Sequence, residues 1–390
     1  VFAVWLGDRS GLTRELRQQF LESGTAHILA VSGVHCGIIF YSGGFILSIF
    51  VRNRRLRAVF ILALLFLFAF AAGARISTLR AVIMFTLYLA ADCCGRERDA
   101  PTALGAAALL FLAVNPALLF DPGFLMSFLS VASLLLFAEP LSERVPEYAQ
   151  RAARPIAACA TVQLLPLPLA VHFFHVLPWV APFVNLIVIA LVTLVLWGCL
   201  ATLITAAFMP VAAPLFGHAL APLVEAVQFV VEFGAELPGA RWRLTSPALP
   251  AVAAYFGAVT AFAVALRGRA HGRRWIGAGV AGVLLTLLFW TPWHPPATVD
   301  FLDVRHSDAA FIRTPGGTTL LVDGGDRSQY TDQGADTVLP FLLAQGVRHV
   351  DYAIATHPDR DHLGGLISVV RHIGFGVLVL GPPGETVPLE

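Results

Sequence analysis

Two histidines and two aspartates lie within six residues near the C-terminal end of the chain, in the order His357-Pro-Asp359-Arg-Asp361-His362. Imidazole suits zinc, and carboxylates also suit harder ions such as Mn²⁺. Two such ions about 3.5–4 Å apart can activate water and stabilise the attacking and leaving oxygens of a phosphodiester. We predict that all four residues are metal ligands and that Asp361 and His362 also take part in catalysis.

The spacing predicts two divalent metals, Zn or Mn, with His357 and Asp359 on one and Asp361 and His362 on the other. Four ligands cannot complete two sites, so the remaining ligands are expected beyond Glu390. The alternative is a solvated acidic loop that happens to hold two histidines. A strand followed directly by H-x-D-x-D-H-x-G-G is rare by accident, which favours the metal site.

Strands and helices of an α/β domain must position this motif. The pattern predicts strands at 299–304, 309–314, 318–322, 350–356 and 377–380, helices at 335–345 and 366–372, and a hairpin turn at 315–317. The motif follows the strand 350–356 on an irregular loop. Asp323 closes the strand 318–322, where a carboxylate can orient a metal ligand through a hydrogen bond, although an ordinary turn is the alternative. Residues 298–390 are therefore expected to be the first part of an α/β domain.

The rest of the chain has the composition of a membrane protein. Apolar residues make up 57% of the 390 positions and charged residues 13%, whereas soluble globular chains carry about 25% charge. We expect about nine or ten transmembrane helices within residues 27–292, preceded by an extracytoplasmic or interfacial lead-in over 1–26 with a short helix at 12–20. The apolar runs are 28–51, 58–73, 77–92, 101–119, 122–139, 155–171, 181–208, 247–266 and 275–291, and a helix with one polar stripe is expected at 214–237.

The basic residues predict the orientation of these helices. All 26 are arginines, and short arginine-rich loops stay in the cytoplasm. Clusters at 52–57, 96–98, 144–154 and 267–274 occupy every second loop, which leaves the segments before residue 28 and after residue 290 outside the cytoplasm. Arg241 and Arg243 do not follow this pattern. The missing initiator methionine also leads us to expect a part of a longer protein.

Three stretches resemble the membrane domain of the ComEC-type competence family. They are Ser10-Gly11-Leu12 with Gly24-Thr-Ala-His-Ile-Leu-Ala-Val-Ser-Gly-Val-His35, Gly73 with Leu79-Arg-Ala-Val-Ile-Met84, and Asn115-Pro116 with Leu119-Phe-Asp-Pro-Gly-Phe124 and Ser127-Phe128. The order of a polytopic membrane domain and a metallo-β-lactamase-like domain of the αββα type, here truncated, is also similar to that family. The resemblance covers residues 10–375.

This resemblance implies a channel in the cytoplasmic (inner) membrane of a bacterium that admits single-stranded DNA during natural transformation. It implies an extracytoplasmic nuclease domain that degrades the other strand. The implied partners are single-stranded DNA, other DNA-uptake proteins and the lipid bilayer, with a homo-oligomer as a further possibility.

The first hairpin departs from the family pattern. The family usually has D-V-G-Q-G-D-A, whereas this chain has Asp303-Val-Arg305-His306-Ser307-Asp-Ala309 and lacks both glycines. Asp303 is kept, and we predict that it supports the metal site from behind the ligands.

Polar residues within the apolar runs are candidates for lining a channel. Charged and strongly polar groups are costly in a bilayer and usually face a cavity or a partner. Snorkelling side chains are the alternative for each residue taken singly. The candidates are Arg75, Arg80, His35 and Asn185.

Three functions are compatible with the sequence. The first is a DNA-uptake channel fused to a nuclease-like domain. The second is a membrane-anchored metallo-hydrolase of another phosphoester, which nine or so helices disfavour because an anchor needs only one. The third is a channel whose metal domain is no longer catalytic, as the Arg305-His306-Ser307 departure suggests.

Overall fold

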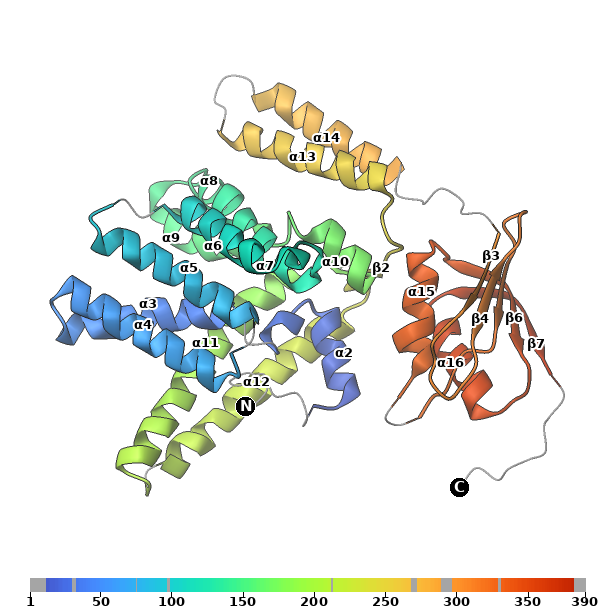
Figure 1. The fold of residues 1–390 in the computed structure, drawn as a ribbon, viewed down its shortest axis with the longest axis horizontal. Helices are drawn as coiled ribbons and strands as arrows, with labels where there is room; N and C mark the ends of the chain where they lie inside the picture. The colour runs from blue at the N-terminus through green and yellow to red at the C-terminus, as the bar shows by residue number, and fades with distance from the viewer. Residues whose placement is uncertain are drawn as a thin grey trace. The chain divides into compact units, whose positions relative to one another are not determined.

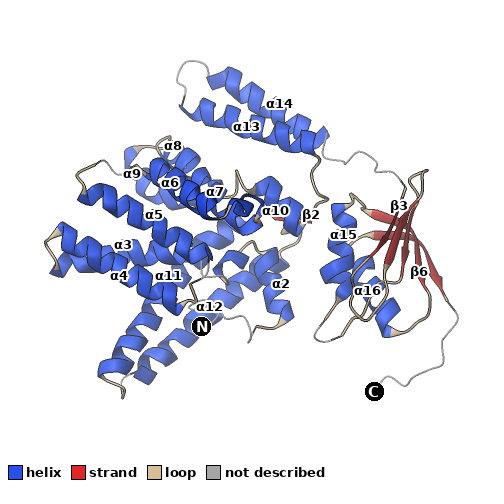
Figure 2. Ribbon diagram, viewed as in Figure 1, coloured by secondary structure: helices blue, strands red, loops and turns tan. Residues whose placement is uncertain are grey.

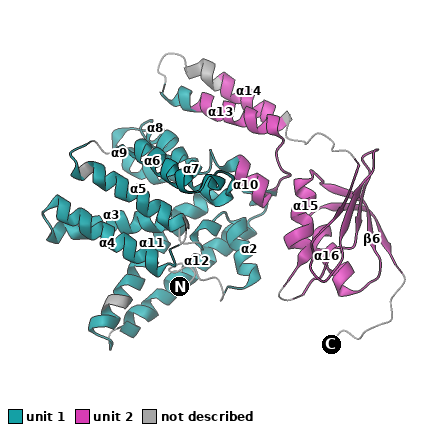
Figure 3. Cartoon of the chain, viewed as in Figure 1, with its two compact units in different colours: residues 1–167, 177–242, 263–272 teal, residues 168–176, 243–262, 273–390 magenta. Residues whose placement is uncertain are grey.

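The computed structural model describes residues 12–29, 33–74, 76–96, 99–211, 213–267, 272–288, 297–328 and 331–381. The chain forms two compact units (Figure 3). The first comprises 1–167, 177–242 and 263–272, and the second comprises 168–176, 243–262 and 273–390. The boundary is therefore crossed several times by the chain.

Most of the chain before residue 289 is helical (Figure 1). Its α-helices are α2 (Arg14–Glu22), α3 (Gly33–Phe50), α4 (Arg54–Ala71), α5 (Ile76–Cys93), α6 (Ala100–Val114), α7 (Pro122–Ser133), α8 (Glu139–Ser142), α9 (Glu147–Thr161), α10 (Leu167–Phe174), α11 (Ala181–Phe208), α12 (Ala213–Glu236), α13 (Leu249–Arg267) and α14 (Gly272–Leu288). Two short 3₁₀-helices, η1 (Ala26–Ile28) and η2 (Pro116–Phe120), a π-helix, η3 (Leu134–Ala138), and two short strands, β1 (Val176–Pro178) and β2 (Arg241–Arg243), complete this part.

Five helical segments among the described residues are long and apolar enough to cross a membrane. They are α3, the continuous segment 122–142 formed by α7, η3 and α8, and the helices α11, α12 and α13. The polytopic helical architecture is thus confirmed, with fewer full-length spans than the nine or ten expected. Helices α6 and α14 are shorter, and α4 begins with three arginines that raise the cost of inserting its first turn.

The apolar run 155–171 does not form one span. Helix α9 ends at Thr161, a turn occupies 162–166, and α10 has only eight residues. Pro166 closes this turn and lacks the N–H that a continuing helix would need.

Side-chain caps fix where several of these helices begin. Asn53 accepts hydrogen bonds from the backbone N–H groups of Arg55 and Leu56, and Asp99 accepts one from Thr102. Asp121 accepts one from Phe124 at 2.6 Å. These caps satisfy N–H groups that the first helical turn leaves unpaired. Each therefore marks a sharp change from loop to helix.

Helices α11 and α12 form a close pair with a buried apolar seam. Gly234 on α12 faces Val184 on α11, where an added Cβ would lie 2.6 Å from the valine Cγ2. Glycine at such a contact allows two helix backbones to approach closely. The predicted polar stripe of α12 is exposed and consists of Glu225, Gln228, Glu232 and Glu236.

The C-terminal part is a mixed five-stranded sheet with helices on one face (Figure 2). The strands are β3 (Thr298–Phe301), β4 (Ala310–Arg313), β5 (Thr319–Val322), β6 (His349–Ala355) and β7 (Gly374–Leu380), in the spatial order β3-β4-β5-β6-β7. Strand β4 is antiparallel to both β3 and β5, whereas β5, β6 and β7 run parallel. The parallel pairs require crossovers, which are a π-helix η4 (Gly334–Val338) with α15 (Leu339–Ala344), and then α16 (Arg360–Val370).

The helices bury one face of this sheet. Phe311 and Leu321 pack with Leu339 and Leu342 of α15 and Leu366 of α16, and all five are at most 2% exposed. On the other face, the register aligns Val299, Ile312, Leu320, Tyr352 and Val377 across the five strands in one apolar row. Val299, Tyr352 and Val377 of this row are exposed. The sheet is therefore apolar on both faces, and the described helices of this part cover only one of them.

Candidate metal centre

The metal-ligand motif lies where β6 passes into α16. Strand β6 ends at Ala355, and α16 begins at Arg360 with Asp359 at its N-cap position. Asp361 and His362 therefore lie in the first helical turn. This corrects the expectation of an irregular loop followed by a helix at 366–372. Gly364 and Gly365, which look like a helix boundary in the sequence, lie inside α16. Another backbone segment packs against them there.

That segment is the loop after β5. The backbone N–H of Gly365 donates to the carbonyl oxygen of Gly325 (2.9 Å), and the N–H of Gly324 donates to that of His362 (2.9 Å). An added Cβ on Gly365 would run into the carbonyl group of Gly324. Glycine at these positions thus allows two backbone segments to touch, which holds the start of α16 against the end of β5.

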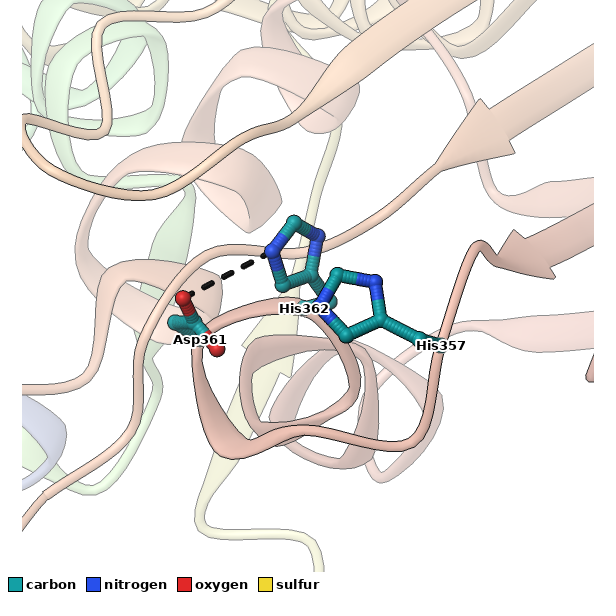
Figure 4. A group of neighbouring side chains, drawn as sticks. All are labelled: His357, Asp361 and His362. Atoms are coloured by element: carbon teal, nitrogen blue, oxygen red, sulfur yellow. Dashed lines mark ion pairs between the residues drawn. The ribbon is translucent and has the colours of Figure 1, made fainter. Parts of the chain in front are cut away.

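Three of the four predicted ligands converge (Figure 4). One ligand atom each from His357, Asp361 and His362 lies within 4.8 Å of the other two. The two imidazole rings are 3.7 Å apart between centroids, and His362 Nε2 is 3.5 Å from Asp361 Oδ2. The side chains are partly exposed, so the group opens to solvent.

Asp359 lies beside this group. Its Oδ2 is 3.4 Å from His357 Nε2, and its side chain is about half exposed. The sequence spacing predicts one metal on His357 and Asp359 and another on Asp361 and His362. In the structure, His357, Asp361 and His362 are the residues that lie close enough to share one ion.

Asp323 contacts the metal-ligand motif from the end of β5. It is 3% exposed, and its Oδ2 accepts a hydrogen bond from His362 Nδ1 at 2.9 Å. Its Oδ1 accepts another from the backbone N–H of Thr356 at 2.8 Å. Asp323 has φ +58°, a left-handed conformation in which aspartate is one of the few tolerated residues.

Asp303 has a different position. It is exposed, and its Oδ1 accepts a hydrogen bond from the backbone N–H of Arg305 in its own loop (3.2 Å). Arg305 has φ +59°. The left-handed conformation thus occurs at the position where the resemblance predicts the first glycine of D-V-G-Q-G-D-A.

Thr356 is the residue that the sequence analysis missed. Its hydroxyl oxygen lies 2.8 Å from Asp323 Oδ2, 3.1 Å from His357 Nδ1 and 3.4 Å from His362 Nδ1. The available signal was its place directly before His357, at the end of a buried strand. Spacing alone does not show that a hydroxyl there reaches both rings.

Comparison with known proteins assigns the helical part. The family model described as "Competence protein" matches residues 4–269, which is more than half of the chain. The chain belongs to the competence protein family. The model for the metallo-β-lactamase superfamily matches residues 302–382, in agreement with the mixed sheet and the position of the metal-ligand motif.

Two relatives of this competence family member cover nearly all of the chain. ComE operon protein 3 of Bacillus subtilis (strain 168) is 25% identical over 386 residues, which is 95% of this chain and 49% of the relative. Competence protein ComA of Neisseria gonorrhoeae is 28% identical over 405 residues, which is 98% of this chain and 53% of the relative. The chain thus spans about half the length of these relatives. No solved structure matches it.

The superfamily match implies a divalent metal, and the residues present fit one. Two imidazoles and a carboxylate are an ordinary donor set for such an ion. Both Nδ1 atoms face Thr356 or Asp323, so the Nε2 atoms are the ones left for a metal. His357, Asp361 and His362 would hold it, and Asp323 would orient His362.

Three of the four membrane candidates lie on described helices, α3, α5 and α11. Arg80 on α5 is 4% exposed, and its Nε and Nη1 have no hydrogen-bond partner within the described part of the chain, while its Cζ lies 5.9 Å from the centre of the Phe124 ring. Asn185 on α11 is buried, and its Oδ1 likewise lacks a partner among the described residues. His35 on α3 is also buried. Arg75 lies outside the described residues.

Proposed function

We propose that this chain is part of a membrane channel that takes up single-stranded DNA in natural transformation, fused to an extracytoplasmic metal-dependent nuclease-like domain. The observation that carries the proposal is the convergence of His357, Asp361 and His362 in a chain whose helical part belongs to the competence family. A group of metal ligands of this kind suits the hydrolysis of phosphodiester bonds.

The nuclease assignment rests on the donor groups. In this proposal the site takes two divalent ions, Zn or Mn, with further ligands supplied from beyond Glu390. When bound, such ions supply an activated water and stabilise the oxygens of a phosphodiester. His357, Asp359, Asp361 and His362 would hold them, and Asp361 and His362 would also take part in catalysis. Asp323 fixes the ring of His362, and Asp303 supports the neighbouring loop.

The channel assignment rests on the buried polar side chains of the helical part. A buried guanidinium is costly when two of its nitrogens have no hydrogen-bond partner among the described residues, as in Arg80, unless a ligand compensates it. A nucleic-acid phosphate supplies that charge without any reading of base sequence. We therefore assign Arg80, with Asn185, His35 and Arg75, to the DNA path. Other DNA-uptake proteins and a second copy of the chain are the expected protein partners.

Substitution of Asp361 tests the nuclease assignment. Asp361→Ala in the purified full chain should lower both its content of bound zinc or manganese and its cleavage of single-stranded DNA, because one of three convergent ligands is lost. Asp336→Ala, at an exposed aspartate of the same unit, is the matched control and should leave both unchanged. Unaltered metal content and cleavage in Asp361→Ala would refute the assignment.

Substitution of Arg80 tests the channel. Arg80→Met should abolish entry of labelled DNA into the cytoplasm at a normal membrane level of the protein, whereas Arg80→Lys, which keeps the cation, should retain part of it. Full uptake by Arg80→Met removes Arg80 from the proposed path. Deletion of the whole gene should abolish DNA uptake if the chain is a channel. A membrane-anchored hydrolase of another substrate would leave uptake unchanged when deleted.

A second candidate function is a channel with a non-catalytic metal domain. The left-handed conformation of Arg305 favours it, because this position lacks the glycine expected there and carries a bulky cation instead. A chain that binds metal and supports DNA uptake, but does not cleave single-stranded DNA, would support this candidate.

A further inference from the structure

The hydroxyl of Thr356 joins Asp323 to both histidines of the metal group. It lies 2.8 Å from Asp323 Oδ2 and 3.1 Å from His357 Nδ1. The same Asp323 oxygen lies 2.9 Å from His362 Nδ1. Asp323 Oδ2 therefore contacts the His362 ring directly and the His357 ring through the Thr356 hydroxyl.

The number of available protons decides the direction of each hydrogen bond. An ionised carboxylate only accepts, whereas a threonine hydroxyl donates one hydrogen and accepts others. The Thr356 proton therefore goes to Asp323 Oδ2. Towards His357 Nδ1 the hydroxyl oxygen can then only accept, so that ring nitrogen must carry the hydrogen.

A neutral imidazole with its hydrogen on Nδ1 has its lone pair on Nε2. For His357, Thr356 provides the acceptor, and for His362 the acceptor is Asp323 directly. Both rings then present Nε2 as a metal ligand in the same protonation state, which is the form that a cation binds.

We propose that Thr356 is a positioning residue that fixes His357 in the Nδ1–H tautomer and so prepares its Nε2 for a divalent metal. This inference rests on the metal centre of the proposed function. Thr356 touches the ligand and not the reacting atoms, so its effect passes through His357.

Valine and serine separate the hydroxyl from the rest of the side chain. Thr356→Val keeps the branched shape, and the backbone N–H of Thr356 still donates to Asp323 Oδ1. Thr356→Ser keeps the hydroxyl and removes the methyl group. Thr356 is exposed, so neither change opens a cavity in the core of the sheet.

The first measurement is zinc affinity of the full chain in detergent micelles, by competition with a chromophoric chelator. Loss of a partner behind a metal ligand weakens metal binding by about 10–100-fold. Thr356→Val should show a loss of this size, and Thr356→Ser should bind zinc like the parent. Thermal unfolding of each metal-free variant checks that the chain remains folded.

The second measurement is the tautomer of His357 in the metal-free parent, which requires no variant to fold. Nitrogen-15 NMR of histidine-labelled protein should give a signal of the Nδ1–H form, assigned to His357 by its loss in His357→Gln. An Nε2–H signal for His357 overturns the inference, as does equal zinc affinity of Thr356→Val and the parent.

The outcomes separate this inference from the proposed function. If the parent binds zinc and His357→Gln does not, but Thr356→Val binds as tightly as the parent, the metal centre stands and the role of Thr356 fails. If the parent and His357→Gln bind zinc equally, the metal centre fails and the role of Thr356 fails with it.

Discussion

Asp323 combines an unusual backbone conformation with three side-chain hydrogen bonds. Its φ of +58° is tolerated by asparagine as well as aspartate, but costs most other residues about 1–2 kcal/mol. The substitution Asp323→Asn would thus keep the shape of the side chain and the backbone conformation while changing the donor and acceptor pattern and removing one negative charge. Asp323→Asn therefore tests the hydrogen bonds and the charge of this carboxylate without changing the backbone.

Asp323→Asn should weaken zinc binding by about 10–100-fold while leaving thermal stability close to that of the parent. With its Oδ1 still accepting from the Thr356 N–H, the new amide would donate towards His362 Nδ1, which would then have to accept. The hydrogen of His362 would move to Nε2 and block a metal. Chelator competition measures the change, and Asp336→Asn, at an exposed aspartate, serves as the control. Zinc affinity equal to that of the parent would show that this carboxylate does not govern His362.

Among the elements, β5 and β6 are joined by a side chain as well as by the parallel ladder. Asp351 Oδ2 on β6 accepts hydrogen bonds from the backbone N–H (2.7 Å) and the hydroxyl (2.9 Å) of Thr319 on β5. These donors, the backbone N–H first, hold the pKa of Asp351 below its ordinary value. The ionised carboxylate therefore stabilises the folded sheet relative to the unfolded chain.

This pairing should give the sheet a specific sensitivity to acid. Since the folded pKa is depressed, the contribution is complete above the pKa of an unfolded aspartate, about 3.9, and is lost as pH falls through the lower folded value. Hydrogen-exchange protection factors of peptides from β5 and β6 should fall in that range. Asp351→Asn should reduce this pH dependence, and Asp308→Asn should not. A parent and an Asp351→Asn chain with the same acid profile would contradict the prediction.

The sequence predicts elements better than it predicts contacts between them. The long spans 181–208 and 214–237 agree with α11 and α12 within a residue, because apolar length depends on local composition alone. The start of α16 could not be found in this way. Gly364 and Gly365 look like a boundary in the sequence, and only the close approach of the loop after β5 explains why they are helical.

At the scale of the whole molecule, the arginines bear on orientation in the membrane. Arg241, which did not follow the pattern of cytoplasmic clusters, lies 2.6 Å from the buried carboxylate of Glu22 and donates to the Ala235 carbonyl oxygen at 3.1 Å. The paired carboxylate offsets its charge. Arg241 is therefore weaker evidence on topology than the clusters of several arginines are.

The proposed orientation predicts the labelling of two exposed positions. In a chain whose five native cysteines are replaced by alanine, Asp308→Cys should react with a membrane-impermeant maleimide in spheroplasts. Glu143→Cys, next to Arg144 at the start of the arginine cluster 144–154, should react only after the membrane is permeabilised. The cysteine-free chain is the control for background labelling. Labelling of Glu143→Cys in intact spheroplasts would reverse the orientation.

The row of Val299, Ile312, Leu320, Tyr352 and Val377 has a consequence for laboratory work. It runs across all five strands on the face that α15 and α16 leave open, and Phe301 at the edge is 85% exposed. Contiguous apolar surface of this kind favours self-association in water. A soluble fragment cut out around the sheet would thus tend to precipitate, and a lack of nuclease activity in it would reflect solubility and not the chemistry of His357.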